Sequence, residues 1–194
     1  MLSDLMIDLE TLDTSPTATV LTIGAVKFDP FGDDSKNPSW DTFYVKVDID
    51  SCDKLGCTIS SATMDWWSKQ SPEAQEEAFS PDNRLPIEEA LSQLHKFARG
   101  SKRVWSHGAG FDVVICETLF RKVERAIPWG FWEVRDTRTI FDLGINPNRA
   151  KVTAHHALED AKDQALGVQA VMRSLKTSTT SGGNYLMPLS QPKS

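Results

Sequence analysis

The hydrophobic pattern of the chain changes near residue 60, and this change restricts the fold more than any other feature of the sequence. Before it, three segments have the composition of β-strands. After it, segments with helical spacing alternate with short strand-like runs. This order predicts an α/β fold in which an antiparallel meander is followed by parallel strands of one mixed sheet, with helices on both faces.

Start and stop signals set the expected boundaries. Ser71, Pro72 and Glu73 supply a helix N-cap, a proline at the first helical position and an acid in the first turn. Gly100 ends the most regular helical pattern. We expect strands at 5–9, 20–28, 42–47, 102–107 and 131–135, short helices within 60–80, and further helices at 86–99, 111–125, 137–143 and 156–175.

Length and composition favour one globular domain. The chain has 194 residues, 40% of them hydrophobic and 25% charged, and roughly two thirds of the unfolded surface can be buried at this size. Such a core needs no disulfide or structural zinc, and Cys52, Cys57 and Cys116 lack C-x-x-C spacing. We expect a reducing compartment, one domain over residues 1–176 and a flexible or loosely docked tail over residues 177–194.

Charge and hydropathy argue against two classes of protein. A balance of 21 basic and 27 acidic residues gives a net charge of −6, which disfavours a protein that coats nucleic acid through bulk electrostatics. A nuclease fits this balance because carboxylates that hold Mg²⁺ are counted without their metal. No basic signal-peptide segment is present, and no uncharged apolar run approaches the roughly 20 residues of a membrane span. We expect a soluble, cytoplasmic protein without a membrane partner.

Asp8 and Glu10 lie two positions apart in the first predicted strand, so their side chains point to the same face of the sheet. Such a pair often faces solvent. Here the strand is otherwise apolar and should be central, where unpaired charge is costly unless a cation lies between the carboxylates. A divalent ion would meet that need.

Two further acids lie at helix starts, where each has an ordinary explanation. Asp112 follows a predicted strand and a glycine-bearing turn, so it is either a helix cap or a ligand at the end of a strand. Asp160 lies near the start of the last helix, where the helix dipole alone favours an acid. His107 and Asp163 are expected to satisfy backbone groups and to face solvent, respectively, with supporting roles as the alternatives.

Four segments carry these acids and their surroundings in a fixed order. Each is a weak signal alone, but they lie on the expected elements. They are Met6-Ile-Asp-Leu-Glu-Thr11, Val20-Leu-Thr-Ile-Gly-Ala-Val26, His107-Gly-Ala-Gly-Phe-Asp112 and His155-His-Ala-Leu-Glu-Asp-Ala-Lys-Asp-Gln164. Together they resemble the DEDDh branch of the DnaQ-like 3′→5′ exonucleases, whose fold is similar to ribonuclease H, over about residues 4–172.

Two more segments resemble one branch of that superfamily. The segments at 65–74 and 134–140 are similar to the branch that contains phage exodeoxyribonuclease A, exonuclease VIII-like proteins and a mycobacterial exoribonuclease. This chain departs from the family at one point. Many relatives have Asn in the segment before the Phe-Asp pair that corresponds to Phe111-Asp112, where this chain has Gly108 and Gly110. An amide contact from that segment is therefore in doubt.

The resemblance implies that four acids hold two divalent ions, Mg²⁺ or Mn²⁺, and that His155 is the general base. Carboxylates are hard oxygen ligands suited to these ions, and two ions roughly 3.5–4 Å apart stabilise the attacking and leaving oxygens of phosphodiester hydrolysis. A histidine has an unperturbed pKa of about 6.5, near working pH. The implied catalytic and metal-binding acids are Asp8, Glu10, Asp112 and Asp160.

Two adjacent histidines leave the register of the base open. His155 precedes Asp160 by five positions and His156 by four. DEDDh relatives place the histidine at minus five, which favours His155. That spacing requires His155 to lie before the helix, because residues five apart within one helix point about 140° apart.

The expected activity is removal of nucleoside monophosphates from a free 3′-OH end, with DNA favoured over RNA because the matching segments are phage-like. An exoribonuclease of the same fold is the nearest alternative. A non-catalytic nucleic-acid-binding module is the other, against which the complete set of acids argues. The sequence predicts no oligomeric state. Candidate substrate contacts are Thr11, Leu12, Trp66, Arg149 and Lys151, of which Trp66 has core or rim packing as its alternative.

Overall fold

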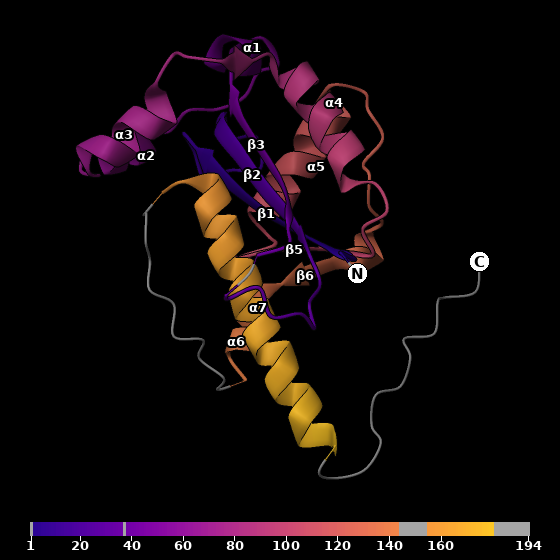
Figure 1. The fold of residues 1–194 in the computed structure, drawn as a ribbon. Coiled ribbons are helices and arrows are strands. Elements are labelled where there is room, and N and C mark those ends of the chain that lie inside the picture. The colour runs from indigo at the N-terminus through magenta and orange to yellow at the C-terminus, as the bar shows by residue number, and fades with distance from the viewer. Residues whose placement is uncertain (1, 37, 144–154, 181–194) are drawn as a thin grey trace.

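The computed structural model describes residues 2–36, 38–143 and 155–180. Its centre is a six-stranded sheet with the strand order β4-β3-β2-β1-β5-β6 (Figure 1). The strands are β1 (Asp4–Thr11), β2 (Val20–Phe28), β3 (Asp41–Val47), β4 (Arg84–Leu85), β5 (Arg103–Ser106) and β6 (Val134–Asp136).

Strand directions confirm the predicted mixed sheet. The first three strands form an antiparallel meander, in which Asp8 is paired with Gly24 and Gly24 with Tyr44. The later strands add to both sides of it in parallel: β5 pairs with β1, β6 with β5, and β4 with β3. The strand that bears the acid pair therefore lies inside the sheet, as its apolar composition predicted.

Helices follow the strands closely. Each predicted helix is present. The prediction lacks α1 and β4, because six and two residues carry too little periodicity. The helices are α1 (Ile49–Lys54), α2 (Ser61–Trp67), α3 (Pro72–Phe79), α4 (Ile87–Ala98), α5 (Asp112–Lys122), α6 (Thr137–Phe141) and α7 (Ala157–Thr180).

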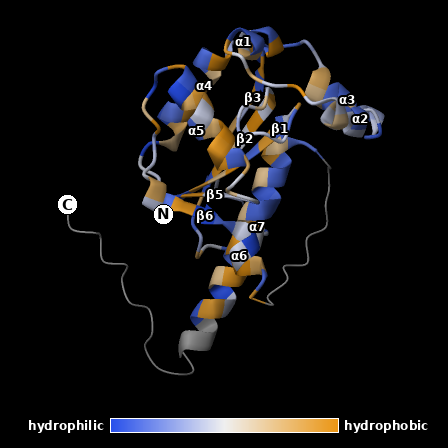
Figure 2. Cartoon of the chain, turned by 180° about the vertical axis from the view of Figure 1, so that it is seen from behind, coloured by the Kyte–Doolittle hydropathy of each residue, from blue (hydrophilic) through white to orange (hydrophobic). Residues whose placement is uncertain are grey.

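The two faces of the sheet are covered by different helices (Figures 1 and 2). On one face, Leu5, Ile7 and Leu9 of β1 belong to a core that includes apolar residues of α4 and α5. On the other, Met6 belongs to a smaller core with apolar residues of α7. The alternation along β1 thus assigns its even-numbered residues, Asp8 and Glu10 included, to the α7 face.

Several boundaries differ from the predicted ones by a few residues, and two of these differences change how a segment is described. The segment predicted as a strand at 131–135 starts with a 3-10 turn, Phe131–Glu133, so that β6 begins only at Val134. Helix α7 continues to Thr180, past the expected start of the tail at residue 177, and residues 181–194 lie outside the described part of the chain. No helix in the described residues combines the length and apolar character needed to cross a membrane.

Candidate active site

Three carboxylates meet at the point where α7 begins. Asp8 and Glu10 reach it from β1, and Asp160 from the first turn of α7. One carboxylate oxygen of each residue lies within 4.8 Å of those of the other two. Oxygen ligands at this separation form a donor set of the kind that Mg²⁺ or Mn²⁺ takes in proteins.

A glycine on the neighbouring strand permits this approach. Gly24 is paired with Asp8 in the sheet, and a Cβ atom at Gly24 would lie 2.2 Å from the backbone carbon of Ala157 and the backbone nitrogen of Leu158. Any side chain there would push the start of α7 away from the sheet. The absence of a side chain at Gly24 therefore allows Asp160 to reach the acids of β1.

Asp112 reaches the same cavity as these acids from the start of α5. Its carboxylate accepts a 3.1 Å hydrogen bond from the backbone N–H of Leu9, the residue between the two acids of β1. It is the first residue of α5, and Phe111 occupies the N-cap position, so capping does not explain the acid. Burial raises the pKa of Asp112 to about 7.

The surroundings of Asp8 disfavour its charged form. Burial raises the pKa of its carboxyl well above the ordinary value, and Asp112, Glu10 and Asp160 raise it further. The Gln164 amide donates a 2.6 Å hydrogen bond to Asp8 Oδ1 and acts in the opposite direction. One amide cannot neutralise several neighbouring carboxylates, whereas divalent ions can.

The two histidines occupy different surroundings. His155 lies before α7 with φ of 63°, in the left-handed region that non-glycine residues rarely adopt. Its ring contacts the ring of Trp66 edge-on, with 4.8 Å between centroids. His155 also lines the same cavity as the four acids. The histidine that the sequence favours as the base thus lies beside the acids. Its role as the base stays a prediction.

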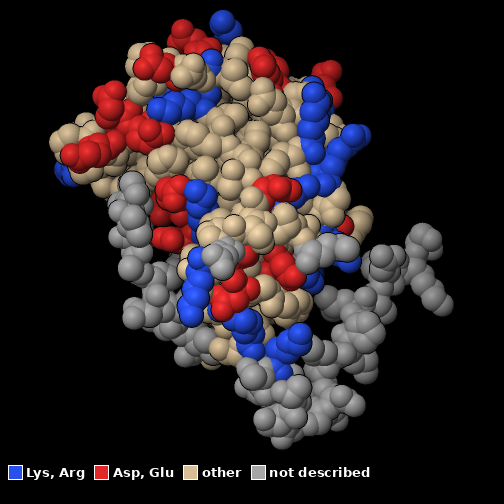
Figure 3. All heavy atoms as spheres, viewed as in Figure 1, with Lys and Arg blue, Asp and Glu red and all other residues tan. Residues whose placement is uncertain are grey.

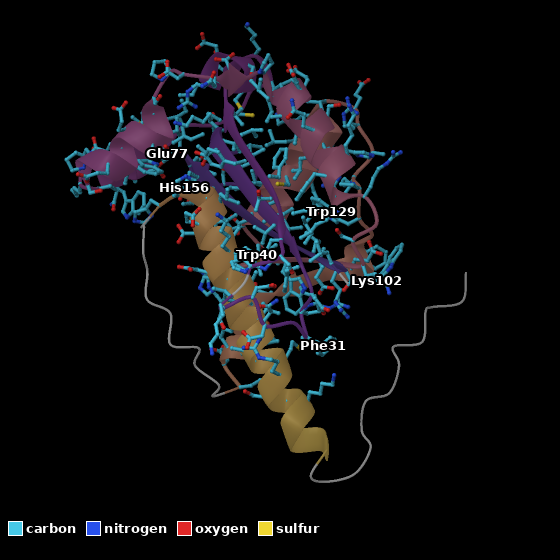
Figure 4. The ribbon with its side chains drawn as sticks, in the orientation of Figure 1. Phe31, Trp40, Glu77, Lys102, Trp129 and His156 are labelled. Atoms are coloured by element: carbon cyan, nitrogen blue, oxygen red, sulfur yellow. The ribbon has the colours of Figure 1, made fainter. Side chains whose placement is uncertain are left out.

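His156 points toward α3 instead, as Figure 4 shows by its position next to Glu77. Its Nε2 atom lies 3.7 Å from a Glu77 carboxylate oxygen, and its ring lies 4.8 Å from that of Tyr44. The Tyr44 hydroxyl donates to the same carboxylate, and Lys46 donates at 3.4 Å to its other oxygen. His156 therefore belongs to a polar cluster beside the cavity and is not among the residues that line it.

The acids and His155 line a cavity of about 520 Å³. His107 and Asp163, for which the sequence favours positions outside the site, also line it. Gln164 and Arg138 were not predicted as site residues; Gln164 had a usable signal, since it lies one helical turn after Asp160. The remaining lining residues are Leu9, Trp66 and Phe111.

A second cavity, of about 420 Å³, adjoins the first and shares Leu9, Glu10, Trp66 and Phe111 with it. Thr11 lines this cavity. Trp66 is 43% exposed and offers its ring to both cavities. Two of the shared residues, Trp66 and Phe111, are aromatic.

Three predicted substrate contacts are not among the described residues that line these two cavities. Leu12 is buried in a core cluster with Leu21 and Trp67, while Arg149 and Lys151 lie outside the described residues. On the face shown in Figure 3, basic side chains of the described residues occur in short groups separated by acidic and uncharged ones.

Sequence comparisons give two matches. Residues 3–172 match the family described as the 3′-5′ exoribonuclease Rv2179c-like domain. A protein of Enterobacteria phage T4 named exodeoxyribonuclease is 25% identical, with the match covering 70% of this chain and 69% of that protein.

Solved structures with the same fold include three nucleases. They are cell-death related nuclease 4 (TM-score 0.57, 14% identity, 88% of this chain), exonuclease X in complex with 5′ overhanging duplex DNA (0.52, 18%, 88%) and the nuclease domain of 3′hExo, a DEDDh family member, bound to rAMP (0.52, 13%, 90%). The chain spans 64% of the first structure and 92% of each of the other two. These likenesses agree with the ribonuclease H-like fold expected from the sequence.

Proposed function

The chain belongs to the family of Rv2179c-like 3′-5′ exoribonuclease domains, and with it to the DEDDh 3′-5′ exonucleases; we propose that it hydrolyses the last phosphodiester of a nucleic acid with a free 3′-OH end. The products are a nucleoside 5′-monophosphate and a chain one nucleotide shorter. The observation that carries this proposal is the meeting of Asp8, Glu10 and Asp160 within 4.8 Å, with Asp112 and His155 at the same cavity.

The carboxylates would hold two divalent ions, Mg²⁺ or Mn²⁺. Bound ions supply charge stabilisation for the attacking and leaving oxygens and make water a better nucleophile. The protein contributes fixed oxygen ligands on rigid elements: two on β1, one at the start of α5 and one at the start of α7. The raised pKa values of Asp8 and Asp112 support this assignment, because a cation would favour their ionised forms.

His155 would accept the proton of the attacking water. A neutral imidazole at the edge of the acid cavity is suited to this role, because its unperturbed pKa is about 6.5. The Trp66 ring beside it restricts the orientation of the imidazole. His156 is excluded from the role in this proposal by its position at Glu77.

The cavity lined by Thr11, Trp66 and Phe111 would receive the terminal nucleoside. Its aromatic walls can stack on any base, which suits an enzyme that removes successive nucleotides irrespective of sequence. The predicted contacts from Leu12, Arg149 and Lys151 stay predictions.

DNA is the proposed substrate and RNA the alternative. The phage T4 relative is named an exodeoxyribonuclease, which supports DNA. The family is described by an exoribonuclease, which favours RNA. Discrimination rests on contacts with the 2′-hydroxyl, so a direct comparison of the two sugars is needed.

The test uses 5′-labelled DNA and RNA of identical sequence, each with a 3′-OH. Shortening should require Mg²⁺ or Mn²⁺, stop in EDTA and start again when metal is restored, with DNA degraded faster. A 3′-phosphate should block or slow it. Binding without shortening under all metal conditions would instead support a non-catalytic binding module, and cleavage of a circular substrate would contradict the exonuclease assignment.

A further inference from the structure

Arg138 is a cation in a cavity of carboxylates. Of the described residues that line the acid cavity, five are Asp or Glu and one, Arg138, is Lys or Arg. It lies in the first turn of α6, directly after β6. A positive charge at this position suits an anionic ligand that also meets the metal-binding acids.

The backbone around Arg138 is built to hold this arrangement. The Asp136 carboxylate accepts hydrogen bonds from the backbone N–H groups of Arg138, at 2.9 Å, and of Ala109, at 2.8 Å. It therefore joins the start of α6 to the turn before Asp112. Thr137 and His107 are hydrogen-bonded at 2.7 Å across the same junction.

Gly108 leaves the space that the guanidinium occupies. Its φ is 114°, and a Cβ atom there would lie 2.7 Å from Arg138 Nη1. The absence of a side chain at Gly108 therefore gives Arg138 room at the wall of the acid cavity.

The described residues offer the Arg138 guanidinium no hydrogen bond or ion pair. Its one recorded interaction with them is electrostatic, with the Asp112 carboxylate. By contrast, Arg103 is bonded to Asp4, and Arg135 donates to two backbone carbonyls. An exposed arginine without such partners, held at the wall of a binding cavity, is available to a substrate.

The two cavities indicate which phosphate it meets. The proposed nucleoside cavity shares Trp66 and Phe111 with the acid cavity, whereas Arg138 and His107 line the acid cavity alone. A chain whose last nucleoside lies against Trp66 and whose last phosphodiester lies at the acids must continue away from Trp66. Arg138 then lies on the side where the next nucleotide begins.

We propose that Arg138 binds the phosphodiester immediately 5′ of the one that is hydrolysed, and so acts as a second phosphate contact that aligns the chain for cutting. This inference rests on the proposed exonuclease function. Arginine is suited to the role because its planar guanidinium donates paired hydrogen bonds to phosphate oxygens.

The test removes the charge from either partner. Three 5′-labelled oligonucleotides with a 3′-OH are used: unmodified, with one neutral methylphosphonate at the second linkage from the 3′ end, or with one at the fifth. The rate of removal of the first nucleotide is measured with subsaturating wild-type, Arg138→Gln and Arg121→Gln enzyme. Arg121 is an exposed arginine of α5, ion-paired with Glu117, and serves as the control.

For the wild type and the control, the neutral second linkage should slow removal roughly 10-fold or more, the effect of one lost charge-assisted hydrogen bond, and the fifth should not. Arg138→Gln should be slower by a similar factor on the unmodified chain and show no further loss with the neutral second linkage. Arg138→Lys should recover part of the rate.

Additive losses from Arg138→Gln and the neutral second linkage would overturn the contact, as would an unchanged rate of Arg138→Gln on the unmodified chain. Insensitivity of the wild type to the second linkage would do the same. If the wild type released no nucleotide from any of the chains with Mg²⁺ or Mn²⁺, the exonuclease function itself would fail, and the Arg138 assignment with it.

Discussion

Two carboxylates on the same face of β1, Asp4 and Asp8, have opposite surroundings. Asp4 is fully buried and accepts hydrogen bonds from Arg103 Nε and Nη2, at 2.7 and 3.0 Å, and from Trp105 Nε1, at 2.7 Å. Asp8 accepts one from Gln164 and otherwise faces acids. The chain thus satisfies the first carboxylate by its own donors and leaves the second with one amide donor among acids.

We interpret this contrast as the difference between an acid that the chain satisfies by itself and one that, in the proposed function, holds a cation. Both side chains are costly to bury, and the cost is offset either by cationic and hydrogen-bond partners in the chain or by something that binds. The two adjacent histidines before α7 show the same contrast. His156 has Glu77 and Tyr44 beside it, whereas His155 lines the cavity of the acids.

The largest effect should come from Asp8→Asn. Loss of one of the carboxylates that would hold the proposed ions should lower the rate of nucleotide release by more than about 10⁴-fold. The fold should persist, and the metal-free protein should become more stable because one repelling charge is removed. Single-turnover hydrolysis and thermal unfolding measure the two effects. Wild-type turnover by this variant at saturating Mg²⁺ would show that Asp8 resembles Asp4 after all.

The histidine pair should give the next largest effect. His155→Ala should lower the rate of hydrolysis by roughly 10²–10⁴-fold, the range for removal of a general base, while Mn²⁺ binding is largely retained. His156→Ala should be milder because this side chain does not line the cavity. Rates and Mn²⁺ affinities of both variants decide between them, and the reverse ranking would place the base at His156.

Half of this contrast could be predicted from the sequence. The period of two in a strand places Asp8 and Glu10 on one face, and the apolar neighbours place that strand inside the sheet. The central position of β1 and the mixed sheet are confirmed. No comparable local rule reveals that Arg103 and Trp105 satisfy Asp4, because those contacts cross about a hundred positions of the chain.

The positions that the sequence left open depend on such distant contacts. The contact between His156 and Glu77 forms only when the segment before α7 meets α3, and no spacing of residues marks the left-handed backbone of His155. Arg138 reaches the cavity because β6 pairs with β5 beside the turn at Gly108. A spacing of residues carries no signal for either arrangement. The choice of His155 over His156 rests on the resemblance to a family. No feature of the sequence predicted that Arg138 would line the cavity.

Asp4→Asn should produce a stability effect without a comparable catalytic one. It removes the charge that pairs with Arg103 while keeping the shape of the side chain, so the free energy of unfolding should fall by about 2–3 kcal/mol. Urea denaturation measures this loss. The rate of hydrolysis at a temperature where the variant is folded should stay within a few-fold of wild type. A catalytic loss as large as that of Asp8→Asn would remove the distinction between the two acids.

The smallest effect concerns pH and the metal-free protein. The raised pKa values of Asp8 and Asp112 mean that, between about pH 4 and pH 7, the folded state retains protons that the unfolded state has released. Protons bound in excess by the folded state make stability fall as pH rises. The Tm in EDTA should therefore fall over this window, by roughly 2–4 °C for each kcal/mol lost. Asp112→Asn should flatten the decrease, and saturating Mg²⁺ should oppose it increasingly toward pH 7. A metal-free Tm that rises from pH 4 to 7 to the same extent in wild type and Asp112→Asn would show that Asp112 is as well satisfied as Asp4.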